Sequence, residues 1–291
     1  MKKSLLLTLL ILTISFSCQE QENTVEPEVN FDEASTFLSN MFSQTIQHSI
    51  SNAKFEMNEN QLEFSNSDII GNYLKENYFP ELEPLELSTN SQSNARISEE
   101  DSHFTEEQQS FISDLDETMN NISSAEEFYA SIDEYRNRVI NNSAMSDEQK
   151  IEMLAMVEYS NALHEYLITG GISEIKEILP EVNNVNGRSA RVSQQRPKYE
   201  ILECEEDEDN PNCGGGGCSI DWRALWSDAV VGFFGGVVGG CYAGATGGTI
   251  VLGPLGTVTG CVGVGMVSGA GGFISGAGYS AISQMIQTCG R

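Results

Sequence analysis

Apolar residues recur every three or four positions through most of the first 180 residues, which predicts amphipathic helices. The first helix is expected to begin at Asp32, whose side chain can cap it. A shorter helix is predicted from Asp68 to Tyr78, ahead of Pro80, because the residue before a proline disfavours helical geometry. The acidic half of the chain is therefore expected to be helical.

Three capping boxes follow, each of which offers two side-chain hydrogen bonds to free amides at a helix start. They are Thr105 with Gln108, Ser124 with Glu127, and Ser146 with Gln149. Gly170-Gly171 is expected to end the third of these helices, before a short one from Ile172 to Leu179. The short connections predict a small three-helix bundle.

The C-terminal third has a different pattern, in which glycines recur at four-residue intervals. Residues four apart share one face of a helix, so this spacing predicts a groove where another backbone can approach closely. A break at Gly253-Pro254 predicts a helical hairpin with arms of about 24 to 30 residues, enough to cross a hydrocarbon layer about 30 Å thick. The expected helix-packing residues are Gly232, Gly236, Gly240, Gly244, Gly248, Gly256, Gly260, Gly265, Gly269, Gly272 and Gly276.

These patterns together predict an all-α fold, with a small acidic helical bundle and a glycine-rich apolar helical hairpin. The expected organisation is a signal peptide (1–17), a tether (18–30), an acidic helical domain (31–180) with a linker near 83–100, a flexible linker (181–217) and the hairpin (218–291). Within the flexible linker, the basic stretch from Arg188 to Lys198 is a candidate site for proteolytic cleavage.

Charge separates the same two regions. The net charge of -28 argues against nucleic acid, and against an anionic membrane surface, as a partner of the acidic half, because phosphates would be repelled. From Ala229 to Gly290 there are 62 residues without Asp, Glu, Lys or Arg. That segment is expected to be buried in lipid or, as the alternative, to pack on itself and on the acidic bundle as the core of a soluble domain.

The N-terminus has the proportions of an export signal. Lys2 and Lys3 precede an apolar core from Ser4 to Phe16, which is too short for a permanent membrane span. Ser17-Cys18 then resembles a lipoprotein cleavage site, which implies that Cys18 receives the lipid. We expect a chain anchored in the cell envelope, at the outer membrane or the cell surface; ordinary secretion is the alternative.

The remaining cysteines are even in number, which favours three disulfides in an exported chain. The candidates are Cys204, Cys213, Cys218, Cys241, Cys261 and Cys289. The hairpin would bring Cys218 near Cys289 and Cys241 near Cys261, the latter about 4.5 Å out of step, and Cys204 with Cys213 would close a local loop. Free buried thiols are the alternative. No spacing matches a zinc motif, so no metal is expected.

No catalytic constellation is present in the sequence, and we expect neither enzyme activity nor a cofactor. The histidines are His48, His103 and His164, and none belongs to a zinc-protease pair. The third is expected to lie at the edge of an apolar helix face with its polar atoms satisfied. The acidic run from Glu205 to Asp209 lacks the ligand spacing of a calcium loop and is expected to be a solvated linker.

The tail from about residue 219 to 288 resembles the glycine-zipper segments of class II bacteriocins and of glycine-zipper envelope lipoproteins. The resemblance lies in the glycine run that starts at Gly232 and in Gly253-Pro254-Leu255-Gly256. It implies a hairpin that inserts into membrane lipid, or forms a homo-oligomer there, and that could form pores. The alternative is a structural or interaction lipoprotein, not an enzyme, whose hairpin packs within its own fold.

Overall fold

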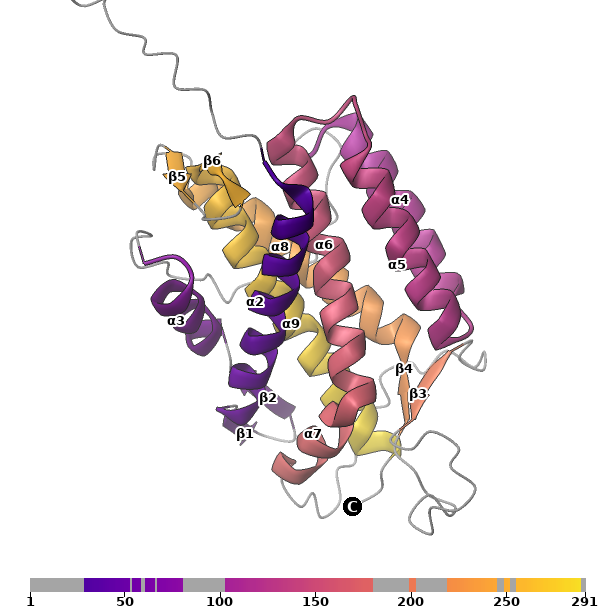
Figure 1. Cartoon of the computed structure of the whole chain (residues 1–291). Coiled ribbons are helices and arrows are strands. Elements are labelled where there is room, and N and C mark those ends of the chain that lie inside the picture. Colours follow the sequence, from indigo (N-terminus) through magenta and orange to yellow (C-terminus); the bar gives the residue numbers. More distant parts are fainter. Residues whose placement is uncertain are drawn as a thin grey trace, which may run out of the picture.

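The computed structural model describes residues 29–52, 54–58, 61–65, 67–80, 103–179, 199–202, 219–244, 249–251 and 255–288, and most of them are helical (Figure 1). The chain thus has the all-α fold that its pattern predicts. The helices are α2 (Phe31–Ser51), α3 (Ser67–Asn77), α4 (Glu106–Asn121), α5 (Ala125–Ile140), α6 (Asp147–Tyr166), the π-helical turn η2 (Leu167–Gly171), α7 (Ile172–Ile178), α8 (Trp222–Gly244) and α9 (Gly260–Thr288).

The capping signals are mostly realised. Thr105 with Gln108 and Ser146 with Gln149 form complete capping boxes at the starts of α4 and α6. Ser124 caps α5, but the Glu127 side chain accepts from the backbone amide of Ser123 at 2.8 Å, so the capping box at Ser124 is incomplete. The predicted cap at Asp32 is wrong by two residues, because Asn30 accepts from the Asp32 and Glu33 amides instead.

Helix α6 is the central helix of the acidic half and is buried on almost every side. It packs on α2, α5 and α9, whereas α4 packs more extensively on α8 than on α5 or α6. The predicted bundle of α4, α5 and α6 is therefore not a separate unit. A helix that is buried on almost every side belongs in a core rather than at the edge of a three-helix bundle.

A buried ion pair connects the acidic helices. Glu158 on α6 is 1% exposed, and its carboxylate accepts from Arg136 Nε at 2.6 Å. The same oxygen accepts from the Ser35 hydroxyl of α2, also at 2.6 Å. Because a buried carboxylate is costly unless it is paired and hydrogen-bonded, these contacts fix α2, α5 and α6 relative to one another.

Three short antiparallel strand pairs join the helices: β1 (Lys54–Asn58) with β2 (Gln61–Ser65), β3 (Glu200–Leu202) with β4 (Ser219–Asp221), and β5 (Thr249–Val251) with β6 (Thr257–Thr259). None was predicted. The β3 strand lies inside the linker expected at 181–217, so this part of that linker is ordered against β4 at the start of the hairpin.

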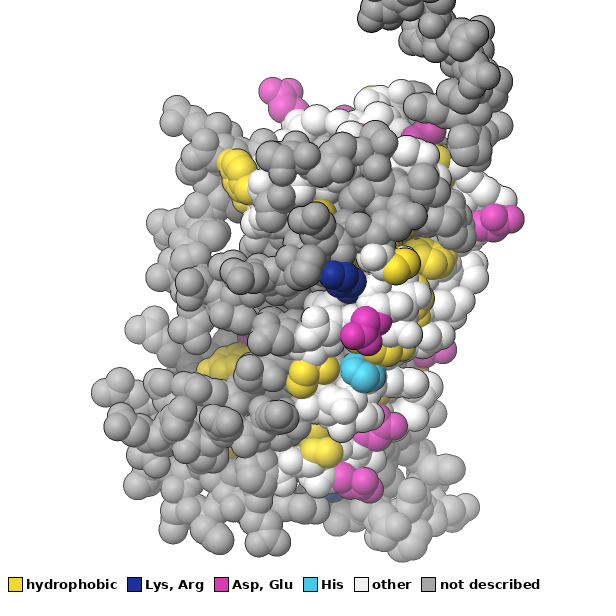
Figure 2. Space-filling view, turned by 90° about the vertical axis from the view of Figure 1, so that its left-hand side faces the viewer, with side chains coloured by type: hydrophobic (Ala, Val, Ile, Leu, Met, Phe, Trp, Pro, Cys, Tyr) yellow, Lys and Arg dark blue, Asp and Glu magenta, His cyan; other side chains and the backbone are white. Residues whose placement is uncertain are grey.

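Helices α8 and α9 form the predicted hairpin, which passes through the middle of the molecule (Figure 1). One continuous hydrophobic core contains residues from the hairpin and from the acidic helices. We call helices α2 to α6 the shell, because they cover the hairpin. Acidic and hydrophobic side chains are interspersed over the described part of one outer face (Figure 2).

Candidate functional site

The interface between α8 and α9 is made by backbone contact at glycines. A Cβ atom added to Gly232 would collide with the carbonyl of Gly272, and one added to Gly272 would collide with the carbonyl of Gly232. A Cβ atom added to Gly236 would likewise collide with the backbone carbonyl of Ser268, one added to Gly244 with that of Gly260, and one added to Gly276 with that of Asp228. The glycine spacing predicts a close approach of two helices, and in this structure the two helices are α8 and α9 of the same chain.

The other expected packing glycines differ in their surroundings. A Cβ at Gly240 would lie 2.6 Å from the Val264 carbonyl, and one at Gly269 would lie 2.7 Å from the side chain of Val237. Gly265 is less crowded, with the Val237 carbonyl at 3.2 Å from such an atom. The glycine-rich interface between α8 and α9 thus runs along the full length of the hairpin.

Gly256 is not a helix-packing residue, contrary to the sequence prediction. It has a φ of 75° in the connection before β6, and α9 begins four residues later at Gly260. A positive φ is accessible to glycine at little cost, so the residue serves the turn. Several predicted sites lie outside the described residues: Gly248, Cys18, Cys204, Cys213, Cys218 and Cys289, together with the break at Gly253-Pro254.

Both hairpin helices are long and apolar enough to cross a membrane by length and composition. Their burial differs, since 78% of the apolar stretch of α9 is buried, compared with 44% of the apolar stretch of α8. The exposed large hydrophobic side chains include Val231 and Tyr242 on α8 and Tyr279 on α9. Helix α9 is therefore the core helix of this fold, and α8 is partly open to solvent.

The aromatic residues at the start of α8 are buried. Trp222 and Trp226 are both 0% exposed. The Trp226 indole donates to the Asp116 carboxylate of α4 at 2.9 Å, and Trp222 packs edge-on against Phe128 of α5. These rings form the main aromatic contact between hairpin and shell at this end.

At the other end of the hairpin, a Glu148 oxygen of α6 accepts from the Thr259 amide at 2.7 Å. An apolar pocket of about 320 Å³ lies between the two ends, where α4 faces α8. Its lining includes Phe104, Ile112, Val230 and Phe234. Among the described residues, polar contacts from α4 and α6 thus hold the shell to the two ends of the hairpin, and the junction between α4 and α8 is incompletely filled.

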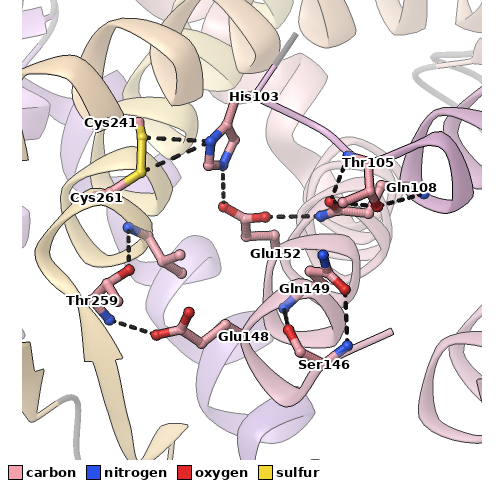
Figure 3. Close-up of polar contacts among 11 residues, drawn as sticks. His103, Thr105, Gln108, Ser146, Glu148, Gln149, Glu152, Cys241, Thr259 and Cys261 are labelled. Carbon is pink, nitrogen blue, oxygen red and sulfur yellow. Dashed lines mark hydrogen bonds and ion pairs between the residues drawn. A yellow bond between two sulfur atoms is a disulfide. The ribbon is translucent and has the colours of Figure 1, made fainter. Parts of the chain in front are cut away.

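A cluster of polar side chains lies beside the closed end of the hairpin (Figure 3). Cys241 of α8 and Cys261 of α9 form a disulfide, with their Cα atoms 3.9 Å apart. His103, just before α4, places Nδ1 at 3.5 Å from the Cys241 sulfur and 3.8 Å from the Cys261 sulfur. Its other nitrogen, Nε2, lies 2.7 Å from Glu152 of α6.

Glu152 is 3% exposed, and both of its oxygens have partners. One contacts His103, and the other accepts from the Gln108 amide at 2.9 Å. The oxygen of that same Gln108 side chain accepts from the Thr105 backbone amide at 3.1 Å, as part of the capping box of α4. The local signal that starts α4 therefore also fixes the carboxylate that orients His103.

The hydrogen bond to Glu152 raises the pKa of His103 above 6.5, more than partial burial lowers it. Since the folded-state pKa is the higher one, the pair stabilises the fold fully below pH 6.5, and this contribution disappears as pH rises through the raised pKa. We expect Glu152→Gln to return the pKa of His103 towards 6.5. A proton NMR titration of the imidazole in both proteins measures this, and equal midpoints would contradict it.

His164 was expected at the edge of a helix face with its polar atoms satisfied, but it is 0% exposed. Its ring stacks on Phe128 at 4.0 Å and meets Trp222 edge-on. Nε2 lies 2.9 Å from the Tyr199 hydroxyl, whereas Nδ1 has no hydrogen-bond partner among the described residues. Burial lowers the pKa of His164 to about 4.

Comparison with protein-family models, with curated proteins and with solved structures finds no match to this chain.

Proposed function

We propose that the chain is a non-enzymatic protein, lipid-anchored in the cell envelope through Cys18, that stores a membrane-active hairpin inside an acidic helical shell. When the shell separates from the hairpin, α8 and α9 insert into lipid as one unit, or several of these glycine-rich hairpins form a homo-oligomer there. Membrane lipid is the partner in this proposal. Pore formation by several hairpins is one form that the activity could take.

The observation that supports this proposal most is that the hairpin makes its closest contacts with itself. Glycine-to-backbone contacts join α8 to α9 from Asp228–Gly276 at one end to Gly244–Gly260 at the other. The shell covers mainly the apolar outer surface, which lipid could cover equally well. A transfer from shell to bilayer would therefore leave the glycine interface intact.

The dimensions agree with a bilayer. Helices α8 and α9 have 23 and 29 residues. At 1.5 Å per residue they are about 34 and 43 Å long, against a hydrocarbon thickness of about 30 Å. Both helices satisfy their own backbone hydrogen bonds, as a segment inside hydrocarbon must.

The second candidate function is a structural or interaction protein in which the hairpin never leaves the fold. The burial of α9 favours it, and so does the aromatic core shared between the two parts. Phe273 of α9 lies edge-on to Phe42 of α2 at 5.4 Å, and Phe42 stacks on Tyr159 of α6 at 4.3 Å. Separating shell from hairpin would expose these rings, so insertion requires a lipid surface to receive them.

Full-length protein mixed with phosphatidylcholine vesicles tests the proposal, because zwitterionic lipid does not repel the acidic shell. Removing two shell carboxylates that accept hydrogen bonds from the hairpin, with Asp116→Ala and Glu148→Ala together, is expected to increase release of an entrapped dye several-fold. The chain's two tryptophans both lie in α8, so quenching of their fluorescence by brominated lipid reports entry of the hairpin alone.

Asp133→Ala is the matched control, because Asp133 pairs with Arg136 within the shell and its side chain is 70% exposed. This control is expected to behave as the wild type does. If the double variant neither releases dye nor shows quenching while remaining folded, the hairpin is a permanent part of the core and the second candidate is the better account.

A further inference from the structure

We propose that reduction of the Cys241–Cys261 disulfide creates a zinc site, in which the two thiolates and His103 Nδ1 are the protein ligands. This site is independent of the proposed membrane activity. The ligand atoms come from three segments: α8, α9, whose cysteine lies 20 positions after that of α8, and the stretch just before α4, where His103 lies 138 positions before Cys241. All three ligand atoms lie within 4.8 Å of one another.

The spacing of nitrogen and sulfur fits zinc. With bonds of about 2.05 Å to nitrogen and about 2.3 Å to sulfur at a tetrahedral angle, two such ligands of one zinc ion are about 3.5 Å apart. The observed distances from Nδ1 to the two sulfurs are 3.5 and 3.8 Å. Only the two sulfurs must separate, to about 3.8 Å, once no bond joins them.

His103 is already oriented as a metal ligand. A Glu152 oxygen faces Nε2, so the neutral ring carries its proton on Nε2 and directs the Nδ1 lone pair at the sulfurs (Figure 3). A carboxylate behind a ligating imidazole is the usual outer partner in zinc sites, where it fixes the ring and raises its basicity. Gln108 holds the second carboxylate oxygen and completes this support.

The site requires a reductant. A dithiol transfers two electrons and two protons to the disulfide; the sulfur–sulfur bond breaks, two thiols form and the dithiol becomes a disulfide. Zinc then displaces one proton from each thiol and binds the neutral imidazole. Because His103 and both cysteines are partly exposed, water can occupy the fourth position.

The two states connect the molecule differently. The disulfide links α8 only to α9, within the hairpin. Zinc would add a bond to His103, and so would tie the closed end of the hairpin to the shell. In the oxidised state the disulfide would thus join the two helices of the hairpin only to each other. After reduction, zinc would also bond the hairpin to His103 of the shell side.

The test uses the full chain with Cys18, Cys204, Cys213, Cys218 and Cys289 replaced by serine, so that Cys241 and Cys261 are the only cysteines. The protein is reduced with a phosphine, freed of metal and titrated with Zn²⁺ against a chromophoric chelator. We expect one zinc per chain after reduction and none in the oxidised protein. Co²⁺ should give the visible bands of a four-coordinate ion and a thiolate charge-transfer band.

Variants separate this site from adventitious binding by thiols. Glu152→Gln is expected to weaken zinc binding about 10- to 100-fold, and His103→Ala to weaken it further. His48→Ala, which changes a histidine that stacks on Tyr73, is expected to leave it unchanged. Equal affinity in the His103→Ala variant would overturn the proposal. So would a reduced chain that binds no zinc, whether it stays folded or loses its helical signal without recovering it on zinc addition.

Discussion

Gly232→Ala is expected to destabilise the fold by about 3 kcal/mol, the upper part of the usual range for overpacking. The added methyl group would meet the backbone carbonyl of Gly272, which has no flexible side chain that could move aside. The two helices would have to separate along their length. Gly272→Ala should have a similar effect, because its methyl group would meet the Gly232 carbonyl in the same way.

Gly239→Ala is the matched comparison, since it lies seven residues further along the same helix. A methyl group there would meet nothing within 4 Å. Alanine is favoured over glycine in a helix by about 0.8 to 1.0 kcal/mol, so this substitution is expected to stabilise the protein. Chemical denaturation of both variants gives the two free energies of unfolding. Effects of the same sign would show that the glycine face of α8 has been assigned incorrectly.

The sequence predicts the hairpin well because its information is local. Four-residue glycine spacing determines which face is bare, and the bare faces of two consecutive helices can meet only if the chain turns back. The capping boxes at Thr105 and Ser146 are local in the same sense, since each needs only residues three apart. The disulfide between Cys241 and Cys261 agrees with the pairing that the hairpin predicts, despite the expected mismatch.

What covers the hairpin could not be predicted, because apolar helix surfaces look the same whether lipid or protein will bury them. Trp222 and Trp226 illustrate this ambiguity, since an aromatic pair before an apolar helix is typical of a membrane interface, yet both rings are buried against the shell. Which helices pack together depends on their shapes and on contacts between distant segments, and the sequence of one segment alone does not carry this information.

The polar cluster was missed for a related reason. His103 and Cys241 are separated by 138 positions, and metal motifs are recognised by short spacings. The one local indication was Gln108 of the capping box, whose amide also reaches Glu152. The short strands were missed as well, although a paired register such as Phe55 with Phe64 reflects an alternating pattern that could have indicated them.

Acid is expected to weaken the contact between shell and hairpin through His164. Unfolded chains bind a proton at a histidine as pH falls below 6.5, whereas the pKa of the buried His164 is lowered to about 4. Between these values the unfolded state binds more protons, so stability falls as pH falls, by up to about 3 kcal/mol at pH 4. The charge would form against Trp222, which belongs to the hairpin.

His164→Phe removes this titration while keeping a ring of similar shape between Phe128 and Trp222. We therefore expect the variant to lose less stability than the wild type between pH 7 and pH 4.5, in chemical denaturation followed by tryptophan fluorescence. His48→Gln is the matched control, because it replaces a histidine of α2 that stacks on Tyr73 rather than on the hairpin. Equal losses of stability in the wild type and in His164→Phe would show that burial of this imidazole does not make the shell sensitive to acid. In that case, dye release at pH 4.5 should be the same for both proteins.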